Sequence, residues 1–291
     1  MNKQQTRRQL IKTAGFGAAF LAGHSILAPD RLFAQNQPSQ PDTAKTTIKV
    51  GMASYSFRKF NLEQALAMTK QVGLKYIAFK SVHLPLESTQ AEIEAAVAKV
   101  KEAGLELYGG GVIYMKNQDE VDRAFDYAKF AGMKVIIGAP QPELLPLVNK
   151  KVQQYDIKVA IHNHGPGDKT YPTPDSAYEK IKDLDKRIGL CNDVGHTFRA
   201  GVDPAQSAEQ LGDRLFDVHI KDVLVGEGGK PNAKETEVGR GSINIPKFLR
   251  TLVKIKYAGV VAFEYEKDSN GFIAGLAESV GYVKGVLAAI L

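Results

Sequence analysis

Two kinds of apolar pattern alternate along the chain from about residue 48 to its last residue. In one kind, apolar residues run together for four to eight positions, which is typical of buried β-strands. In the other, they recur every three or four positions over ten or more residues, which predicts amphipathic helices. The predicted strands cover residues 48–55, 76–81, 105–111, 135–138, 157–164, 188–193, 215–222 and 260–266. The predicted helices cover residues 62–73, 89–104, 118–132, 142–155, 173–184, 203–212, 245–257 and 272–290.

This regular alternation predicts an α/β fold with a parallel sheet. The eight strand–helix units spread over about 245 residues, and (β/α)8 TIM barrels typically have about 250. We therefore expect a single (β/α)8 TIM barrel over residues 47–291. A doubly wound open sheet is the alternative, but eight regular units favour closure. The one long connection, about 223–241, follows the seventh predicted strand, and we expect a loop over the active face there.

The first 34 residues have the pattern of an export signal rather than of a barrel. Arg7 and Arg8, followed by Lys12, precede the small apolar run "TAGFGAAFLAG", and a basic segment before an apolar run is typical of secretory signals. The segment resembles a twin-arginine signal, which implies export of an already folded protein to the periplasm. An amphipathic N-terminal helix is the alternative. We predict cleavage after Ala34 and a linker over residues 35–46.

The formal charge of +6 at pH 7 is concentrated in this N-terminal segment. Residues 1–34 hold five positive side chains and one negative one, and removing their net +4 leaves +2 on the rest. A nearly neutral mature chain gives no electrostatic reason to expect a nucleic-acid partner.

The rest of the composition bears on disulfides and membranes. Cys191 is the single cysteine, so we expect neither an intrachain disulfide nor a lipid-bearing cysteine after the signal. Outside the N-terminus we expect no run of roughly 18 apolar residues, the length that a membrane span needs. The expected protein therefore has no stable membrane anchor, and its composition is compatible with a homo-oligomer.

Polar residues gather where the predicted strands end, and in TIM barrels the carboxyl ends of the strands form the active site. Five of the six histidines lie at these ends, and the sixth, His24, lies in the signal. Histidines scattered over a surface would not gather at one end of one architecture. The residues at or just after the strand ends are Lys80, His83, His162, His164, Asp193, His196, His219, Lys221 and Glu264.

The parity of the strands sorts these polar residues, because alternate residues of a strand face opposite sides. Asp193, His219 and Glu264 end three consecutive strands and share a face with small residues, which predicts that they point into the barrel mouth. Imidazole and carboxylate together suit one divalent ion such as Mn²⁺, Zn²⁺ or Co²⁺. His162 has the parity of a fourth ligand, and His164, further out, is either a ligand or a substrate contact. A structural network of ion pairs is the alternative.

Short motifs at these strand ends occur in the order found in a known superfamily. They are "HNHG", "DVGH", "HIKD" and "FEYE", with "VGRGSINIP" before the seventh predicted helix. On these motifs the chain resembles, over about residues 47–291, the xylose-isomerase-like TIM-barrel superfamily of sugar isomerases and epimerases, which has 3-keto-glycoside lyases among its relatives. The resemblance implies one divalent metal ion bound by a Glu, an Asp, a His and a Glu. Asp193, His219 and Glu264 match the last three, and His196 matches a histidine that contacts substrate.

His162 departs from the family pattern. The family usually has a glutamate at this position, which in the epimerases is both a metal ligand and one of two acid/base groups. An imidazole keeps the ligand role, but a metal-bound imidazole is no longer free as a base. The difference argues against classical two-base epimerisation and leaves a metal ion beside one carboxylate and several free bases.

Such a site favours removal of a proton next to a carbonyl group, with an enediolate intermediate. The candidate proton-transfer groups are Glu264, His164 and His196. The candidates for binding substrate and neutralising its charge are Lys80, His83, Lys221 and Arg240. This chemistry covers aldose–ketose isomerisation, epimerisation and β-elimination. Because the sequence has no P-loop and an expected exported location, we expect a small unphosphorylated sugar, keto-sugar or glycoside as the substrate.

Two interpretations from other classes compete with an isomerase, epimerase or lyase. One is a non-catalytic, exported sugar-binding barrel that lost its chemistry together with the usual first glutamate. The other is an endonuclease-type relative from the same superfamily, which needs further metal ligands and a basic DNA-binding face. The near-neutral mature chain and the export signal argue against the nuclease.

Overall fold

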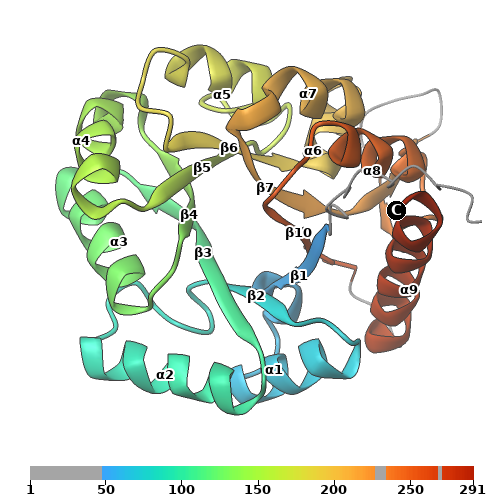
Figure 1. The fold of residues 1–291 in the computed structure, drawn as a ribbon, viewed down its shortest axis with the longest axis horizontal. Helices are drawn as coiled ribbons and strands as arrows, with labels where there is room; N and C mark the ends of the chain where they lie inside the picture. The colour runs from blue at the N-terminus through green and yellow to red at the C-terminus, as the bar shows by residue number, and fades with distance from the viewer. Residues whose placement is uncertain (1–47, 227–233, 268–270) are drawn as a thin grey trace, which may run out of the picture. The chain divides into compact units, whose positions relative to one another are not determined.

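The computed structural model describes residues 48–226, 234–267 and 271–291. Eight parallel strands close into a barrel in the order β1-β10-β7-β6-β5-β4-β3-β2 (Figure 1). Closure confirms the predicted (β/α)8 barrel and rules out a doubly wound open sheet, which has two edges. The predicted signal and linker lie outside the described residues. The barrel strands are β1 (Lys49–Ala53), β2 (Tyr76–Phe79), β3 (Glu106–Met115), β4 (Val135–Pro140), β5 (Lys158–His162), β6 (Ile188–Asp193), β7 (Leu215–Ile220) and β10 (Val260–Phe263).

The helices surround the strands, and their starts carry recognisable caps (Figure 1). Asn61, Thr89 and Thr173 each form a capping box with the third residue of the helix that follows, which satisfies amide groups that a helix start leaves free. The α-helices are α1 (Leu62–Gln71), α2 (Gln90–Glu102), α3 (Gln118–Phe130), α4 (Leu145–Tyr155), α5 (Pro174–Ile181), α6 (Val194–Arg199), α7 (Pro204–Leu211), α8 (Ile245–Lys254) and α9 (Phe272–Ile290).

Three elements differ from the sequence prediction. The last part of the first predicted strand is a 3₁₀ turn, Ser54–Phe57. The short helix α6 directly follows β6, and six residues are too few to show a helical period. The expected loop over residues 223–241 contains part of a small antiparallel sheet, β8 (Asp222–Leu224) with β9 (Lys234–Thr236).

Helix α9 is long and apolar enough, by length and composition, to cross a membrane. The expectation that no such stretch lies outside the N-terminus was therefore wrong. Leu276, Val280, Val283 and Leu287 are buried at spacings of three and four residues, which gives the helix one apolar face toward the core. In Figure 1 α9 lies beside α8 as the last helix of the outer ring. This buried face accounts for part of its apolar composition.

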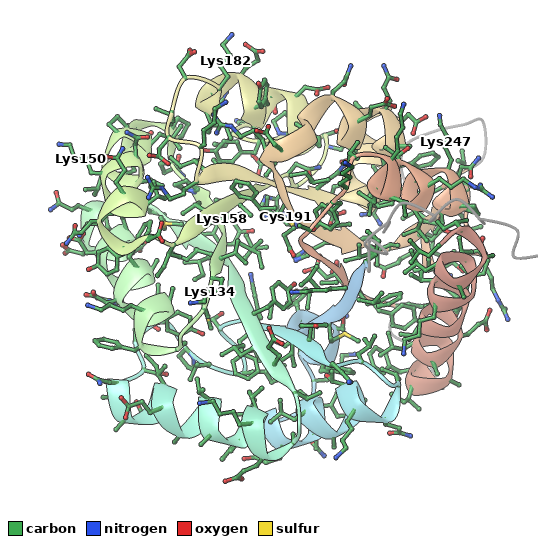
Figure 2. The ribbon with its side chains drawn as sticks, viewed as in Figure 1. Lys134, Lys150, Lys158, Lys182, Cys191 and Lys247 are labelled. Carbon is green, nitrogen blue, oxygen red and sulfur yellow. The ribbon has the colours of Figure 1, made fainter. Side chains whose placement is uncertain are left out.

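The interior of the barrel is filled by side chains from alternate strand positions. Figure 2 shows Cys191 inside the ring of strands, whereas Lys150, Lys182 and Lys247 lie on the outer layer. The Cys191 thiol lies 3.4 Å from Asp217 Oδ2 on the neighbouring strand, so these two positions share the inward face that parity predicts. The same alternation points the polar side chains at the strand ends toward one mouth of the barrel.

Candidate metal centre

Four side chains meet at the carboxyl ends of neighbouring barrel strands. His162, Asp193, His219 and Glu264 each offer one nitrogen or oxygen atom, and these atoms all lie within 4.8 Å of one another. They come from β5, β6 and β7 and from the residue after β10, and all four side chains are buried. The structure therefore brings together the four residues that the sequence proposes as metal ligands.

The shared space is bounded by two ring nitrogens and two carboxylates. His162 Nε2 lies 3.1 Å from His219 Nδ1 and 3.5 Å from Asp193 Oδ2. His219 Nδ1 also lies 3.2 Å from Glu264 Oε2. Two nitrogen and two oxygen donors at such spacing fit one divalent transition-metal ion.

The hydrogen bonding of Asp193 also fits a cation. Its Oδ1 accepts a hydrogen bond from the backbone N–H of His196 at 2.8 Å. Its Oδ2 is buried and receives no well-oriented hydrogen bond from the described residues, although Lys221 Nζ lies 3.0 Å away. A buried carboxylate oxygen without a full partner costs free energy. A bound metal ion would satisfy it.

The pKa directions of three of the four candidate ligands describe the form that binds a metal. For His219, burial lowers the pKa, but Glu264, Asp217 and Asp193 outweigh it and raise the pKa. Burial lowers the pKa of His162 to about 3, so this imidazole is neutral. Burial raises the pKa of Asp193 and of Glu264, but the nearby Lys221 ammonium and histidines outweigh it and hold both pKa values well below their usual range. Neutral imidazole and ionised carboxylate are the states that coordinate divalent ions.

Asp217 supports His219 from the side away from the centre. Its Oδ2 lies 3.5 Å from His219 Nε2, a ring nitrogen that has no hydrogen-bond partner among the described residues, and accepts from the Cys191 thiol. Burial raises the pKa of Asp217 to about 6. A carboxylate behind a metal-binding histidine fixes the ring orientation and the tautomer. Parity places Asp217 on the inward face, but no pattern in the sequence assigns it this role.

A buried amide holds the β5 and β6 strand ends in register. Asn163 accepts from the backbone N–H of Asp193 at 3.0 Å and donates to Thr197 Oγ1 at 3.1 Å. Thr197 in turn donates to Asn192 at 2.6 Å. These bonds position Asp193 as both candidate ligand and N-cap of α6. Sequence reasoning missed this role of Asn163, although the residue lies inside the "HNHG" motif.

Lys221 lies inside the cluster rather than on its rim. Its side chain is fully buried, and Nζ lies 3.0 Å from Asp193 Oδ2, 2.8 Å from Glu264 Oε2 and 2.8 Å from Glu266 Oε1. Burial lowers the pKa of Lys221, but the three carboxylates outweigh it and raise the pKa well above its usual value. The ammonium group is therefore charged and already ion-paired.

One wall of the mouth is built from aromatic and basic side chains. Tyr114 stacks on His164 with ring centres 5.4 Å apart, and its hydroxyl lies 2.9 Å from His164 Nε2. The Lys80 ammonium lies over the rings of Tyr55 and Tyr114 and donates to a backbone carbonyl. Burial lowers the pKa of Lys80 and of His164. Tyr114 is 48% exposed, so part of its side chain is accessible to a ligand.

The remaining predicted site residues have other neighbours. His83 is buried, with Nδ1 2.9 Å from Ser54 Oγ and Nε2 3.1 Å from a backbone carbonyl, so both ring nitrogens hold the local loop. Arg240 is paired with Glu278 of α9. The His196 ring lies 6.1 Å from the rings of His162 and His164. His196 therefore lies beside the cluster, whereas substrate binding by His83 and Arg240 rests on the sequence alone.

Glu235 on β9 is a site residue that the sequence did not indicate. Its Oε1 accepts a hydrogen bond of 2.6 Å from the backbone N–H of Glu266. Burial raises the pKa of Glu235 to about 7, against the opposing effect of Lys221, and Glu266 and Asp193 raise it further. A carboxyl with that pKa holds a proton near neutrality, as an acid catalyst must. The loop around it has no apolar period, so no strand was predicted there.

Asp222 explains the "VGRGSI" segment that follows β9. Its two carboxylate oxygens accept from the backbone N–H groups of Gly239, Gly241 and Ile243 at 3.0–3.2 Å. A Cβ on Gly241 would lie 2.0 Å from Asp222 Oδ1, so glycine is required there. These hydrogen bonds join the segment that follows β9 to the first residue of β8, close to the end of β7.

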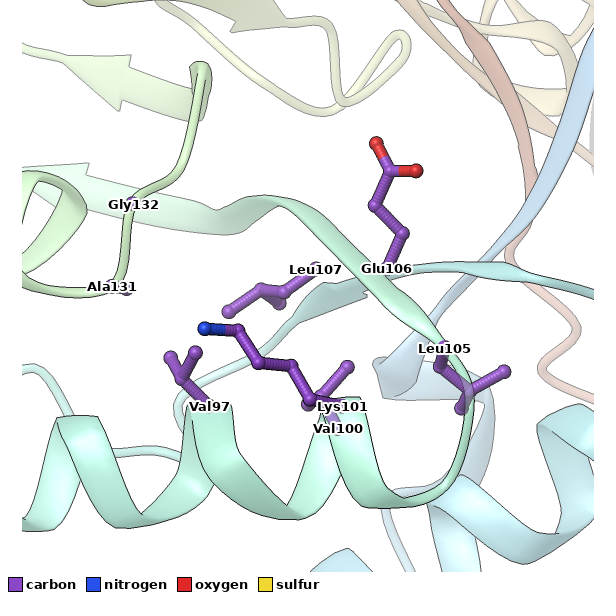
Figure 3. Close-up of a pocket in the computed structure, with 8 residues that line it drawn as sticks. All are labelled: Val97, Val100, Lys101, Leu105, Glu106, Leu107, Ala131 and Gly132. Carbon is purple, nitrogen blue, oxygen red and sulfur yellow. The ribbon is translucent and has the colours of Figure 1, made fainter.

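A separate hollow of about 260 Å³ lies at the other end of the barrel, where β3 begins (Figure 3). Its walls are largely apolar, with Lys101 and Glu106 as the charged members of the lining. Its lining has no histidine and no paired carboxylates, unlike the four-residue cluster at the opposite mouth. The lining residues are Val97, Val100, Lys101, Leu105, Glu106, Leu107, Ala131 and Gly132.

Comparisons with known proteins agree with this geometry. The sequence matches the family model described as "Xylose isomerase-like TIM barrel" over residues 61–285. No curated protein matches at a significant level. Among solved structures, 3-keto-D-glucoside 4-epimerase from E. coli is 16% identical, with a TM-score of 0.68 and coverage of 82% of this chain and 100% of that one.

Two other solved structures show the same fold. An L-ribulose 3-epimerase is 14% identical with a TM-score of 0.67, covering 84% of this chain and 96% of that one. A xylose isomerase domain protein from Alicyclobacillus acidocaldarius is 19% identical with a TM-score of 0.68, covering 84% and 99%. At these identities the likeness establishes the fold.

Proposed function

Because this chain belongs to the xylose isomerase-like TIM barrel family, we propose that it is a divalent-metal-dependent sugar isomerase or epimerase. The observation that carries the proposal is the convergence of His162, Asp193, His219 and Glu264 within 4.8 Å.

The proposed substrate is a small unphosphorylated sugar or keto-sugar. Two of the similar structures are named as epimerases of a keto-D-glucoside and of a ketose, which supports this class. The accessible part of the Tyr114 side chain offers apolar contact area to a sugar. The charged groups at the mouth include Lys80, which suits an oxygen that gains negative charge.

In the proposed mechanism the four residues hold one Mn²⁺, Zn²⁺ or Co²⁺ ion. When bound, such an ion supplies Lewis acidity toward a carbonyl oxygen. His164 is the proposed base because it is not one of the four candidate ligands and because burial lowers its pKa, which favours the neutral ring. Its Nε2 lies 2.9 Å from the Tyr114 hydroxyl and its Nδ1 lies 3.4 Å from Asp168 Oδ2, and these two contacts orient the ring. Glu264 is engaged by both Lys221 and His219, which makes it the less available base. His196, whose ring lies 6.1 Å from the rings of His162 and His164, is the proposed substrate contact.

A second candidate is a 3-keto-glycoside lyase at the same site. It is favoured by His162, which stands where a two-base epimerase has a glutamate, and by Glu235, whose pKa burial raises to about 7, so that a fraction of this carboxyl carries a proton near neutrality. Elimination requires one base for the C–H proton and one acid for the departing oxygen. His164 and Glu235 fit these two roles.

We also propose that the protein acts in the periplasm after export by its twin-arginine-type signal. The support is the sequence of residues 1–34, together with the family membership of the part that follows. A folded, metal-loaded barrel is the kind of cargo that such a signal implies.

The test combines metal content with proton exchange. The purified mature protein is expected to hold about one transition-metal ion per chain by elemental analysis. The Asp193→Ala variant should lose the ion, whereas Asp203→Ala, which removes the N-cap of α7 on the outer layer, should keep it. The wild type is then incubated in D₂O with methyl 3-keto-glucoside and with L-ribulose.

Deuterium incorporation beside the carbonyl with an intact glycoside supports an isomerase or epimerase, and release of methanol supports the lyase. Metal without exchange or turnover of any sugar indicates a sugar-binding barrel. A protein that neither contains nor takes up metal contradicts the proposed function.

A further inference from the structure

We propose that Lys221 is a built-in counter-cation of the metal centre: it holds the ligand carboxylates together without the ion and weakens the binding of the ion. The inference rests on the proposed function, since it concerns the same site. It assigns Lys221 a role other than the predicted contact with substrate.

The first support is that Lys221 contacts carboxylate oxygens of two of the four candidate metal ligands. Its Nζ lies 3.0 Å from Asp193 Oδ2 and 2.8 Å from Glu264 Oε2, and both residues belong to the four-residue cluster. The ammonium therefore lies against the oxygen-bearing half of the donor set. A divalent ion bound by the same carboxylates would share their negative charge with it.

The second support is burial. The Lys221 side chain is fully buried, and those of Asp193 and Glu264 are 0% and 8% exposed. Two carboxylates at this depth lose most of their hydration, and leaving such charges unpaired is strongly destabilising. Lys221 supplies one positive charge to them inside the folded chain.

The third support is the way the lysine is anchored. Its Nζ also lies 2.8 Å from Glu266 Oε1, a carboxylate outside the four-residue cluster and 33% exposed. This third ion pair gives the ammonium a partner that the metal ion does not use. Lys221 is thus able to stay in place, as a nearby positive charge, when a metal ion occupies the cluster.

The expected consequence follows from the sign of the charges. A fixed positive charge a few ångströms from a divalent cation opposes its binding, and in a buried site the repulsion is weakly screened. Removing the charge should therefore tighten metal binding. It should also destabilise the metal-free protein, because Asp193 and Glu264 then lack their cation.

The experiment compares wild type with Lys221→Met, prepared in EDTA and then dialysed free of it. Calorimetric titration with Mn²⁺ should give a dissociation constant for the variant that is smaller than that of wild type by about tenfold or more. Thermal unfolding in EDTA should give a lower midpoint for the variant than for wild type. Saturating Mn²⁺ should remove this difference in midpoint, because binding of the ion stabilises the folded state.

The matched control is Lys267→Met. Lys267 is also an ion-paired lysine after β10, but its partner is Glu237, and that pair is not part of the cluster. This control should leave the affinity for Mn²⁺ unchanged. A second variant, Lys221→Met/Glu266→Gln, removes the lysine together with its outer carboxylate and should also bind Mn²⁺ more tightly than wild type.

The outcomes separate the inference from the proposed function. Wild-type binding of Mn²⁺ with equal or weaker binding by Lys221→Met overturns the inference alone. It is also overturned if both Lys221 variants stay unfolded in saturating Mn²⁺, because the ion should replace the missing charge. No uptake of Mn²⁺ or Zn²⁺ by wild type or any variant overturns the proposed function, and the inference with it.

Discussion

The stem of Lys221 packs directly against the Cα of Gly195. A Cβ at position 195 would lie 2.6 Å from Lys221 Cγ and 2.7 Å from its Cδ, well inside normal carbon–carbon contact. The glycine of the "DVGH" motif therefore leaves the space through which Lys221 reaches Asp193. Two motifs that stand apart in the sequence, "DVGH" and "HIKD", depend on each other in space.

Gly195→Ala should therefore destabilise the fold by about 1–3 kcal/mol, the usual cost of overpacking a buried site. Chemical unfolding measures the loss. Gly281→Ala in α9 is the control, because a Cβ there meets nothing within 4 Å and alanine favours a helix. Equal stability of the two variants would show that the Lys221 stem moves aside without cost.

Asp217→Asn should weaken metal binding by about 10- to 100-fold, because the carboxylate behind His219 sets the tautomer of the ring. The 3.5 Å approach of Asp217 to His219 Nε2 motivates the change. Competition with a chromogenic chelator for Zn²⁺ measures the affinity. Asp203→Asn, at the start of α7 and outside the four-residue cluster, should leave it unchanged. Wild-type affinity in Asp217→Asn would mean that the ring is held by its other neighbours.

Glu235 should make the stability of the metal-free protein depend on pH. Its pKa is raised from 4.5 to about 7 in the folded state, so between these values the folded chain binds more protons than the unfolded chain. Stability is then fully present below pH 4.5 and is lost as pH rises through 7, with a slope of up to about 1.4 kcal/mol per pH unit.

Urea unfolding in EDTA at several pH values between 4.5 and 8 measures this contribution. Glu235→Gln should reduce the slope in that window without abolishing it, because Asp217, whose pKa burial raises to about 6, contributes there as well. If the free energy of unfolding of Glu235→Gln changed with pH in parallel with that of wild type, another group would be responsible for the pH dependence.

Export gives a prediction that is independent of the barrel. Full-length protein expressed in a bacterium with a twin-arginine pathway should appear in the periplasm with Gln35 as its first residue. Arg7→Lys/Arg8→Lys should keep it in the cytoplasm uncleaved, because the pathway reads the arginine pair. Mass spectrometry of the two fractions measures both. Unchanged export of the double variant would contradict the assignment.

The fold and the centre of the site were predictable because they depend on local patterns. Apolar runs that end in polar residues located His162, Asp193, His219 and Glu264, and strand parity put them on one face. In a closed parallel barrel all strands end at one mouth, so residues far apart in sequence necessarily meet. Closure supplied the proximity that no single segment contains.

The residues around the four candidate ligands were not predictable, because their contacts depend on side-chain distances and not on local patterns. Lys221 has three carboxylate partners, and choosing among them requires side-chain distances. Arg240, which follows β9, pairs with Glu278 of α9, and no pattern in the sequence indicates this contact. Glu235 lies on a strand of three residues, too short for a period of two to show.

Asp193 joins the metal centre to the backbone, because the amide of His196 donates to its Oδ1 at 2.8 Å. A change in the charge or position of that carboxylate must alter the strength of this hydrogen bond. The exchange rate of the His196 amide proton is therefore a built-in reporter of occupancy. Hydrogen exchange of this one amide would follow metal loading before any substrate is identified.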